Sequence, residues 1–203
     1  MKRLLSLCKR NGILVMVDET YAEFAPTLSD ITAIPLTESY DNLLVLRGVS
    51  KFWAAPGLRL GYAVTGNKSM LDEINASKNP WTVSSLADAA GQVMFTDTGY
   101  ISRTQNLIRA ERGHCCSFLS ALPGLKVFPS FANFVLVRIL EQGITAQDIF
   151  EAAIRKKMMI RDCSSFHSLD ESFFRFCFMG HEENERLLTC IKEVTCRRTD
   201  SLQ

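Results

Sequence analysis

The sequence predicts an α/β fold, with part of a mostly parallel sheet in the first half and a small α+β domain in the second. Continuous apolar runs at 13–17, 43–46 and 60–64 indicate strands buried on both faces, as in parallel sheets. Helical spacing of apolar residues dominates from 67 to 122. After 123, short apolar strands alternate with helical patterns, which favours helices packed on a short antiparallel sheet.

Turn and cap residues set the expected limits of each element. In the first half we expect helices at 1–11, 67–77 and 84–95, a polar loop from 18 to about 41, and the three strands above. In the second half we expect strands at 126–128, 133–139 and 172–179, and helices at 145–157 and 181–197, with Thr145 and Asp148 forming a variant capping box.

Two domains follow from this order of elements. We expect residues 1–100 to form one domain and residues 101–203 the other. A long helix at about 98–122, stopped by Pro123-Gly124, would join them.

Composition excludes several classes of function. The 203 residues are 47% apolar, and 23 basic against 22 acidic residues give a net charge of +1, so no general attraction to nucleic acid or membranes is expected. Seven cysteines form no CxxC pair, which indicates reduced thiols and no metal site. The first apolar run is too short for a signal peptide and none is long enough to span a membrane, so we expect a cytoplasmic protein.

The stretch 50–62 carries the main candidate for chemistry. Lys51 follows a predicted strand in an uncharged, aromatic loop, and by itself it is best interpreted as a solvated lysine. Its surroundings, S-K-x-x-x-x-P-G-L-R-x-G-Y, resemble the pyridoxal-phosphate (PLP) lysine motif of class I and II aminotransferases. The resemblance implies that Lys51 attaches PLP covalently, while Arg59 and Ser50 bind the cofactor phosphate. Gly48 departs from the family, which usually has Ser or Thr there to bond that phosphate.

A second motif lies upstream, at the end of the first predicted strand. Residues 17–24 resemble the family's V-D-E-x-Y-x-x-F segment. The resemblance implies that Asp18 keeps the pyridine nitrogen of PLP protonated and that Tyr21 bonds the ring oxygen. Alone, Asp18 would be interpreted as a cap or turn residue. Its combination with the lysine motif favours the cofactor role.

The second half contributes substrate-binding candidates. Residues 173–176, F-F-R-F, resemble the strand whose arginine clamps the substrate carboxylate, which implies that role for Arg175. Asn133 matches a position that helps to orient this arginine. An edge-strand solubility residue is the alternative interpretation of Arg175.

A further block narrows the branch of the family. Residues 161–166, R-D-C-S-S-F, resemble a block shared by histidinol-phosphate aminotransferases and threonine-phosphate decarboxylases. Both act on amino acids with a distal phosphate, so the resemblance implies that Arg161 binds a substrate phosphate. The alternative for Arg161 is a surface cation. His167-Ser168 stands where the block usually has Pro-Gly.

Two finer resemblances favour the decarboxylase of cobalamin biosynthesis. K-F-W-A at 51–54 and P-W-T-V-S-S-L-A at 80–87 resemble that subfamily more than the aminotransferases. A histidinol-phosphate or other aminotransferase is the alternative. Orientation of the substrate by Arg161 and Arg175 would decide whether carboxylate or proton leaves Cα.

The resemblance covers residues 1 to about 195, but only the C-terminal part of the family's longer chains. The family's N-terminal part supplies a PLP-stacking aromatic, a phosphate-binding loop and part of the homodimer interface. We therefore expect a homodimer by resemblance, and weak PLP binding and activity for this chain alone. Two further hypotheses are a non-catalytic fragment and a PLP-free regulator. A regulator would be expected to have lost Lys51, Asp18 and Arg59.

Overall fold

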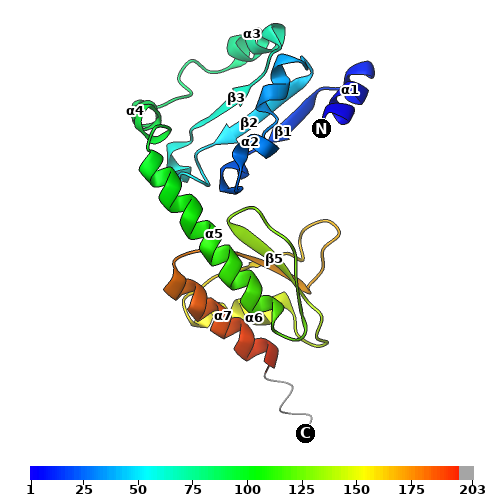
Figure 1. The fold of residues 1–203 in the computed structure, drawn as a ribbon, viewed down its shortest axis with the longest axis vertical. Helices are drawn as coiled ribbons and strands as arrows, with labels where there is room; N and C mark the ends of the chain where they lie inside the picture. Colours follow the sequence, from blue (N-terminus) through cyan, green and yellow to red (C-terminus); the bar gives the residue numbers. More distant parts are fainter. Residues whose placement is uncertain (197–203) are drawn as a thin grey trace. The chain divides into compact units, whose positions relative to one another are not determined.

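The computed structural model describes residues 1–196 and divides the chain into two compact units (Figure 1). The first unit is Met1–Ser102 and the second is Arg103–Gln203. The division falls inside helix α5 (Thr98–Ser120). Each unit contains its own sheet, of three and four strands respectively.

The sheet of the first unit has the strand order β1-β2-β3. Strands β1 and β2 are parallel, with Val15 opposite Leu43, whereas β2 and β3 are antiparallel, with Val45 opposite Val64. All three predicted strands are present, with these bounds: β1 (Val15–Asp18), β2 (Leu43–Gly48) and β3 (Gly61–Val64).

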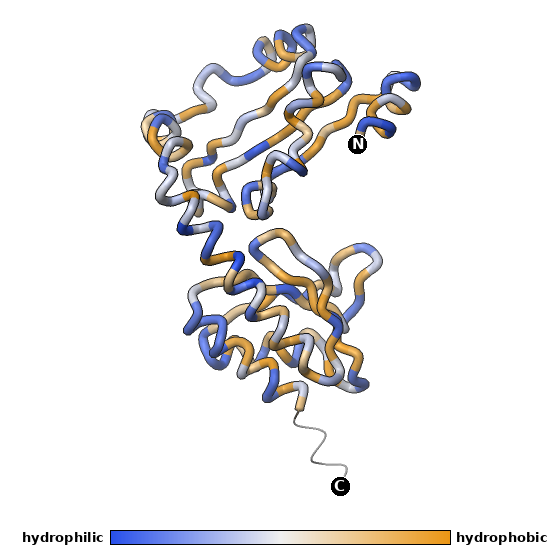
Figure 2. Tube along the Cα trace, viewed as in Figure 1, coloured by the Kyte–Doolittle hydropathy of each residue, from blue (hydrophilic) through white to orange (hydrophobic). Residues whose placement is uncertain are grey.

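Burial in this sheet is less complete than the sequence predicted. Only β2 has a fully buried stretch, at Leu43, Leu44 and Val45. Strand β1 alternates between half-buried and exposed residues, and β3 is mainly exposed, so burial of these strands on both faces is a wrong prediction. The trace through β1 is largely hydrophobic in Figure 2 although Met16 is 59% exposed.

Helices complete the first unit. The helix α1 (Lys2–Arg10) places Leu5 in a small core with Ala33, Leu43 and Val45. The segment predicted as a loop instead contains short helices. The short helices in that segment are η1 (Ala22–Phe24), α2 (Leu28–Ile31) and η2 (Ile34–Glu38). The helices that follow it in the chain are η3 (Pro56–Leu58), α3 (Lys68–Ser77) and α4 (Ser85–Met94).

Side-chain caps explain where α3 and α4 begin. The Asn67 side chain accepts a hydrogen bond from the backbone of Met70, and the Ser84 side chain accepts one from Ala87. Each cap satisfies a backbone N–H that has no partner within its helix.

The second unit contains the antiparallel sheet that the sequence predicted, in the order β4-β5-β7-β6. In its central strands, successive side chains point to opposite faces of the sheet. Val135, Val137, Phe174 and Phe176 are buried on one face, while Arg175 lies on the other. The strands are β4 (Leu125–Val127), β5 (Phe134–Ile139), β6 (Arg161–Asp162), which was not predicted, and β7 (Phe173–Cys177).

Three helices cover the apolar side of this sheet (Figure 1): α5, α6 (Ala146–Arg155) and α7 (His181–Cys196). The predicted capping box is present, because Thr145 accepts from the backbone of Asp148 while the Asp148 side chain accepts from Thr145. Leu119 and Leu188 are fully buried between helices and sheet. Among the described residues, no helix has the length and hydropathy that crossing a bilayer requires.

Candidate active site

Asp18 ends β1 and points its carboxylate into the following turn. Its Oδ1 accepts hydrogen bonds from the backbone N–H of Thr20, at 2.9 Å, and from the Thr20 hydroxyl. The hydroxyl and then the backbone of Thr20 lower the pKa of Asp18 below its usual value. The carboxylate is therefore ionised at neutral pH at the carboxyl end of the sheet.

A hollow of about 280 Å³ opens at the same ends of β1 and β2, and we call it the strand-end hollow. Three of the predicted cofactor-binding residues line it together, namely Asp18, Ser50 and Arg59. The remaining lining residues are Thr20, Leu46, Arg47, Gly48, Ala55, Pro56, Leu60 and Gly61.

Lys51 and Tyr21 lie close to each other, and neither lines this hollow. The Lys51 ammonium lies 5.8 Å from the centre of the Tyr21 ring, and its side chain is exposed. A cation over an aromatic face is weakly attractive, so Tyr21 biases the position of the amine. The structure thus places all five predicted cofactor residues in the first unit, three of them in one hollow.

An aromatic cluster fixes the loop that carries Lys51. The rings of Trp53 and Tyr100 stack, with centroids 5.5 Å apart, and the Tyr100 hydroxyl donates to the Phe52 carbonyl at 2.8 Å. Phe52 is 1% exposed and packs edge-on against Phe24. These contacts hold the two residues that directly follow the lysine, Phe52 and Trp53.

Arg59 stands in an unusual backbone conformation. Its φ of 52° lies in the left-handed region, where a non-glycine residue is uncommon. The guanidinium donates to the Pro56 carbonyl at 3.0 Å, and no ion-pair partner lies within reach among residues 1–196. An exposed guanidinium without a carboxylate partner is suited to an anionic ligand.

A buried ion pair beneath the hollow was missed by the sequence analysis. Arg47 donates to Glu19 Oε2 at 2.7 Å and to the Thr32 hydroxyl at 2.9 Å, while Glu19 Oε1 accepts from the Ala33 backbone. Burial alone would lower the pKa of Arg47, but the bond to Glu19 and the charge of Glu23 raise it overall. Burial raises the pKa of Glu23 beside this pair. The available signal was Glu19, an acidic residue directly after a predicted strand. The sequence alone does not indicate that Arg47 is its partner.

The two predicted substrate-binding arginines meet in the second unit. Arg161 of β6 and Arg175 of β7 are directly paired across the two strands, so both side chains lie on the same face. Their guanidinium carbons stand 5.6 and 5.2 Å from the centre of the same Phe166 ring. Arg175 also lies 5.1 Å from the ring centre of Phe134.

These two arginines line a pocket of about 960 Å³, which we call the arginine pocket. Arg161 donates to the Ser165 hydroxyl at 3.3 Å, and neither arginine forms an ion pair within residues 1–196. Burial raises the pKa of the adjacent Cys163, which keeps this thiol neutral beside two cations. The pocket lining also includes two further cations and two carboxylates, namely Lys157, Arg186, Asp162 and Glu183, so cations outnumber acids four to two.

Asn133 was predicted to orient Arg175, and the structure shows no contact of this kind between the two side chains. Its backbone carbonyl accepts from the Phe178 N–H at 2.8 Å, but no hydrogen bond to Arg175 is present among the described residues. The side-chain Oδ1 is buried and has no partner in the described part of the chain. Such an acceptor is costly unless a donor reaches it.

Comparison with known proteins gives a consistent set of relatives. The threonine-phosphate decarboxylase of Salmonella typhimurium is 32% identical over 92% of this chain and 50% of its own length. The histidinol-phosphate aminotransferase of Methanothermobacter thermautotrophicus is 31% identical over 95% and 50%. The crystal structure of the histidinol-phosphate aminotransferase from Clostridium acetobutylicum superimposes with a TM-score of 0.89 at 30% identity, covering 96% of this chain and 57% of that one.

The chain spans about half the length of the curated relatives it matches. The sequence profile described as "Aminotransferase class I and II" matches residues 1–191, which is nearly the whole chain. On these findings the chain belongs to the class I and II aminotransferase family.

Proposed function

We propose that this chain contributes the lysine and the substrate arginines of a PLP-dependent decarboxylase acting on threonine phosphate. PLP is the cofactor of the class I and II aminotransferase family. The observation that carries the substrate class is the pairing of Arg161 with Arg175 over one Phe166 ring. Two neighbouring guanidinium groups without carboxylate partners fit a substrate with both a carboxylate and a phosphate.

The strand-end hollow fits PLP in its charge pattern. An ionised Asp18 suits the protonated pyridine nitrogen, while Arg59 and the Ser50 hydroxyl suit the phosphate. The hollow lacks a side chain at Gly48, so one hydroxyl contact to the phosphate is missing. The fit supports binding that is weaker by about 1 kcal/mol than with a hydroxyl at this position.

The residues of the chain divide the chemistry between them. When bound, PLP withdraws electrons from the bonds at the substrate's Cα. Lys51 provides the amine that attaches the cofactor and later transfers a proton at Cα. Arg175 holds the carboxylate, Arg161 holds the phosphate, and Asn133 Oδ1 accepts a hydrogen bond from Arg175.

Chemical trapping tests the role of Lys51. The chain is incubated with PLP, reduced with borohydride and mapped by peptide mass spectrometry. We expect a pyridoxyl group on Lys51. In the Lys51→Arg variant, the corresponding peptide should carry no pyridoxyl group. The variant Lys68→Arg changes the next lysine along the chain, serves as a control and should keep the label on Lys51. A label confined to other lysines would contradict the assignment.

Product analysis separates the decarboxylase from the aminotransferase. The chain with PLP receives threonine phosphate, or histidinol phosphate with 2-oxoglutarate, and Lys51→Ala with the same PLP corrects for the free cofactor. Turnover by this chain alone should be slow, and within it we expect CO₂ and aminopropanol phosphate in excess over any keto product. Since the relatives of both names are about equally similar, faster transamination of histidinol phosphate would favour the alternative.

A second copy of this chain is the assembly partner we propose. Apolar side chains of the first unit, such as Met16 and Trp81, are 59% and 87% exposed. Exposed apolar surface of this kind favours association. Sedimentation equilibrium should give a dimer mass, and a monomer at all concentrations would contradict it.

A further inference from the structure

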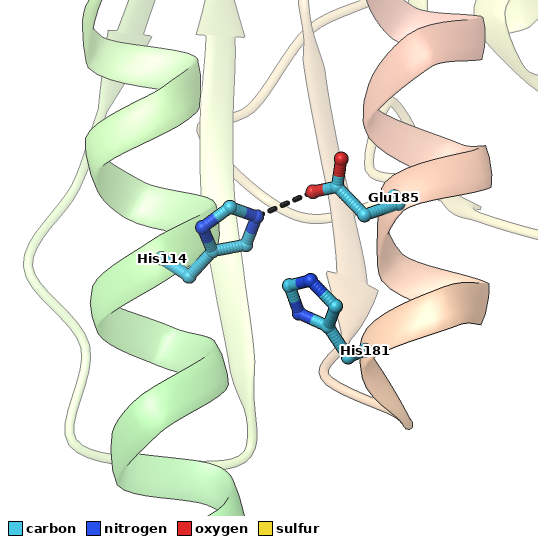
Figure 3. A group of neighbouring side chains, drawn as sticks. All are labelled: His114, His181 and Glu185. Carbon is cyan, nitrogen blue, oxygen red and sulfur yellow. Dashed lines mark hydrogen bonds and ion pairs between the residues drawn. The ribbon is translucent and has the colours of Figure 1, made fainter.

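A cluster of two imidazoles and one carboxylate lies between α5 and α7 of the second unit. His114 comes from α5, while His181 and Glu185 come from the first turns of α7. The spacing of four residues puts His181 and Glu185 on one face of α7. Figure 3 shows the two rings and the carboxylate turned toward one another.

The distances are close to those of a metal site. One ligand atom from each of the three residues lies within 4.8 Å of the others. His114 Nε2 already contacts Glu185 Oε1, and the two imidazole centroids are 5.0 Å apart. Ligands about 2.1 Å from a tetrahedral ion stand about 3.4 Å apart, so small side-chain rotations complete the geometry.

A buried carboxylate behind the cluster orients one of its rings. Glu111, which is 6% exposed, has its Oε1 at 3.1 Å from His181 Nδ1. Its Oε2 accepts from Asn184 Nδ2 at 2.8 Å, and Asn184 in turn is bonded to the backbone of Met179. With Nδ1 donating to Glu111, His181 keeps Nε2 available as a ligand, which is how carboxylates support metal-bound histidines.

The chemistry of the donor set indicates the class of ion. Nitrogen from two imidazoles with one carboxylate oxygen suits Zn²⁺ and similar first-row dications. The neighbouring Cys115 is fully buried, whereas none of the three ligand residues is. The side chains of His114 and His181 are 39% and 63% exposed, so an ion can enter and water can complete its coordination.

We propose that His114, His181 and Glu185 bind one first-row transition-metal dication such as Zn²⁺ and that this ion joins α5 to α7. The metal replaces the contact between His114 and Glu185 with a bond to each. Glu111 is a positioning residue in this site, since it acts through His181. The sequence analysis expected no metal because its search concerned cysteine spacing, and His114 stands 67 positions before His181 in the chain.

Titration with Zn²⁺ tests the site on the full 203-residue chain, with exposed thiols alkylated beforehand. We expect one Zn²⁺ per chain. His114→Gln and His181→Gln should each weaken its affinity at least about tenfold, and Glu111→Gln should weaken it less. His167→Gln changes the third histidine of the chain, outside the cluster, and should leave the affinity unchanged.

Two further readouts separate a specific site from loss of fold. Saturating Zn²⁺ should raise the melting temperature of the second unit in the parent chain and in His167→Gln, but not in the two cluster variants. Co²⁺ should give visible d–d bands without a thiolate charge-transfer band. No Zn²⁺ binding, or binding that His114→Gln and His181→Gln leave intact while circular dichroism shows them folded, would overturn the proposal.

Discussion

The two units of the chain cover their sheets in different ways. In the second unit, α5, α6 and α7 cover one face, and the large side chains of Phe174 and Leu188 are fully buried there. In the first unit, Leu86 of α4 is 77% exposed and Met16 of β1 is 59% exposed. The second unit thus has a conventional apolar core, whereas much apolar surface of the first remains in contact with water.

Polar contacts compensate in part for this difference. The first unit joins β1, β2 and the segment before η2 through the buried pair of Glu19 and Arg47. The second unit uses its buried carboxylate, Glu111, to join two helices that are also held by apolar packing. Since a buried ion pair is costly to break, the first unit should depend on it more than the second depends on any one polar contact.

The largest expected effect comes from removing one leucine from each unit. Leu119→Ala in the second unit leaves a cavity in a fully buried position, and it should cost about 3–5 kcal/mol of unfolding free energy. Leu86→Ala in the first unit removes an exposed side chain and should cost less than about 0.5 kcal/mol. Hydrogen exchange, measured unit by unit, checks both values. Equal losses would remove the contrast between the units.

Arg47→Met tests the polar core of the first unit. It leaves the Glu19 carboxylate buried without its cation, and we expect a loss of about 3 kcal/mol in that unit alone. The matched control is Lys9→Met, which breaks the exposed pair with Asp41 and should cost less than about 1 kcal/mol. Urea unfolding followed by tryptophan fluorescence measures the first unit, since both tryptophans, Trp53 and Trp81, lie in it. A loss below that of the control would show that the pair is dispensable.

Local patterns predicted the second unit better than the first. The strand at Phe134–Ile139 and the capping box at Thr145 depend on alternation and on neighbouring residues, and both are confirmed. Strand β6 is only two residues long, too short for any periodicity. The exposure of β1 and β3 was not predictable, because an apolar run does not reveal whether another element covers it.

The candidate sites show the same limit. Motif resemblance gave Asp18, Ser50 and Arg59, and the structure gathers these three in one hollow. The roles of these residues stay predictions. The Glu19–Arg47 pair was missed because its partners are 28 residues apart. Three-dimensional proximity between distant, unremarkable positions has no local sequence signal.

Arg161→Ala tests whether the arginine pocket of the second unit binds a phosphate group. Removing a charge-assisted contact should weaken the binding of threonine phosphate by about 1.5–3 kcal/mol, while the binding of threonine should change little. Equilibrium dialysis of both ligands gives the ratio. Arg155→Ala, an exposed cation on α6 outside the pocket, is the matched control. Equal losses for the two ligands would contradict a phosphate-binding role.

Gly48→Thr restores a hydroxyl at the edge of the strand-end hollow. A Cβ at this position meets only the Leu60 carbonyl oxygen, at 3.8 Å, so the backbone leaves room for a side chain to begin here. We expect PLP to bind about fivefold more tightly, which corresponds to about 1 kcal/mol. Gly61→Ala is the contrasting variant, because its Cβ would lie 2.9 Å from the Arg47 carbonyl oxygen and should destabilise the unit. Unchanged PLP affinity in Gly48→Thr would place the phosphate elsewhere.

Thr20→Val is expected to have the smallest effect of these variants. It should change the ionisation of Asp18 in the strand-end hollow. It removes the hydroxyl that donates to Asp18 but keeps the backbone N–H, so the pKa of Asp18 should rise toward its usual value. In the parent chain the lowered pKa adds stability at pH values above the ordinary carboxyl range, and this is lost as pH falls through the lowered value. The variant should lose part of that stability near neutral pH and become less sensitive to acid. NMR titration of the Asp18 carboxyl carbon measures the shift, and an unchanged pKa would show that the backbone of Thr20 alone sets the charge.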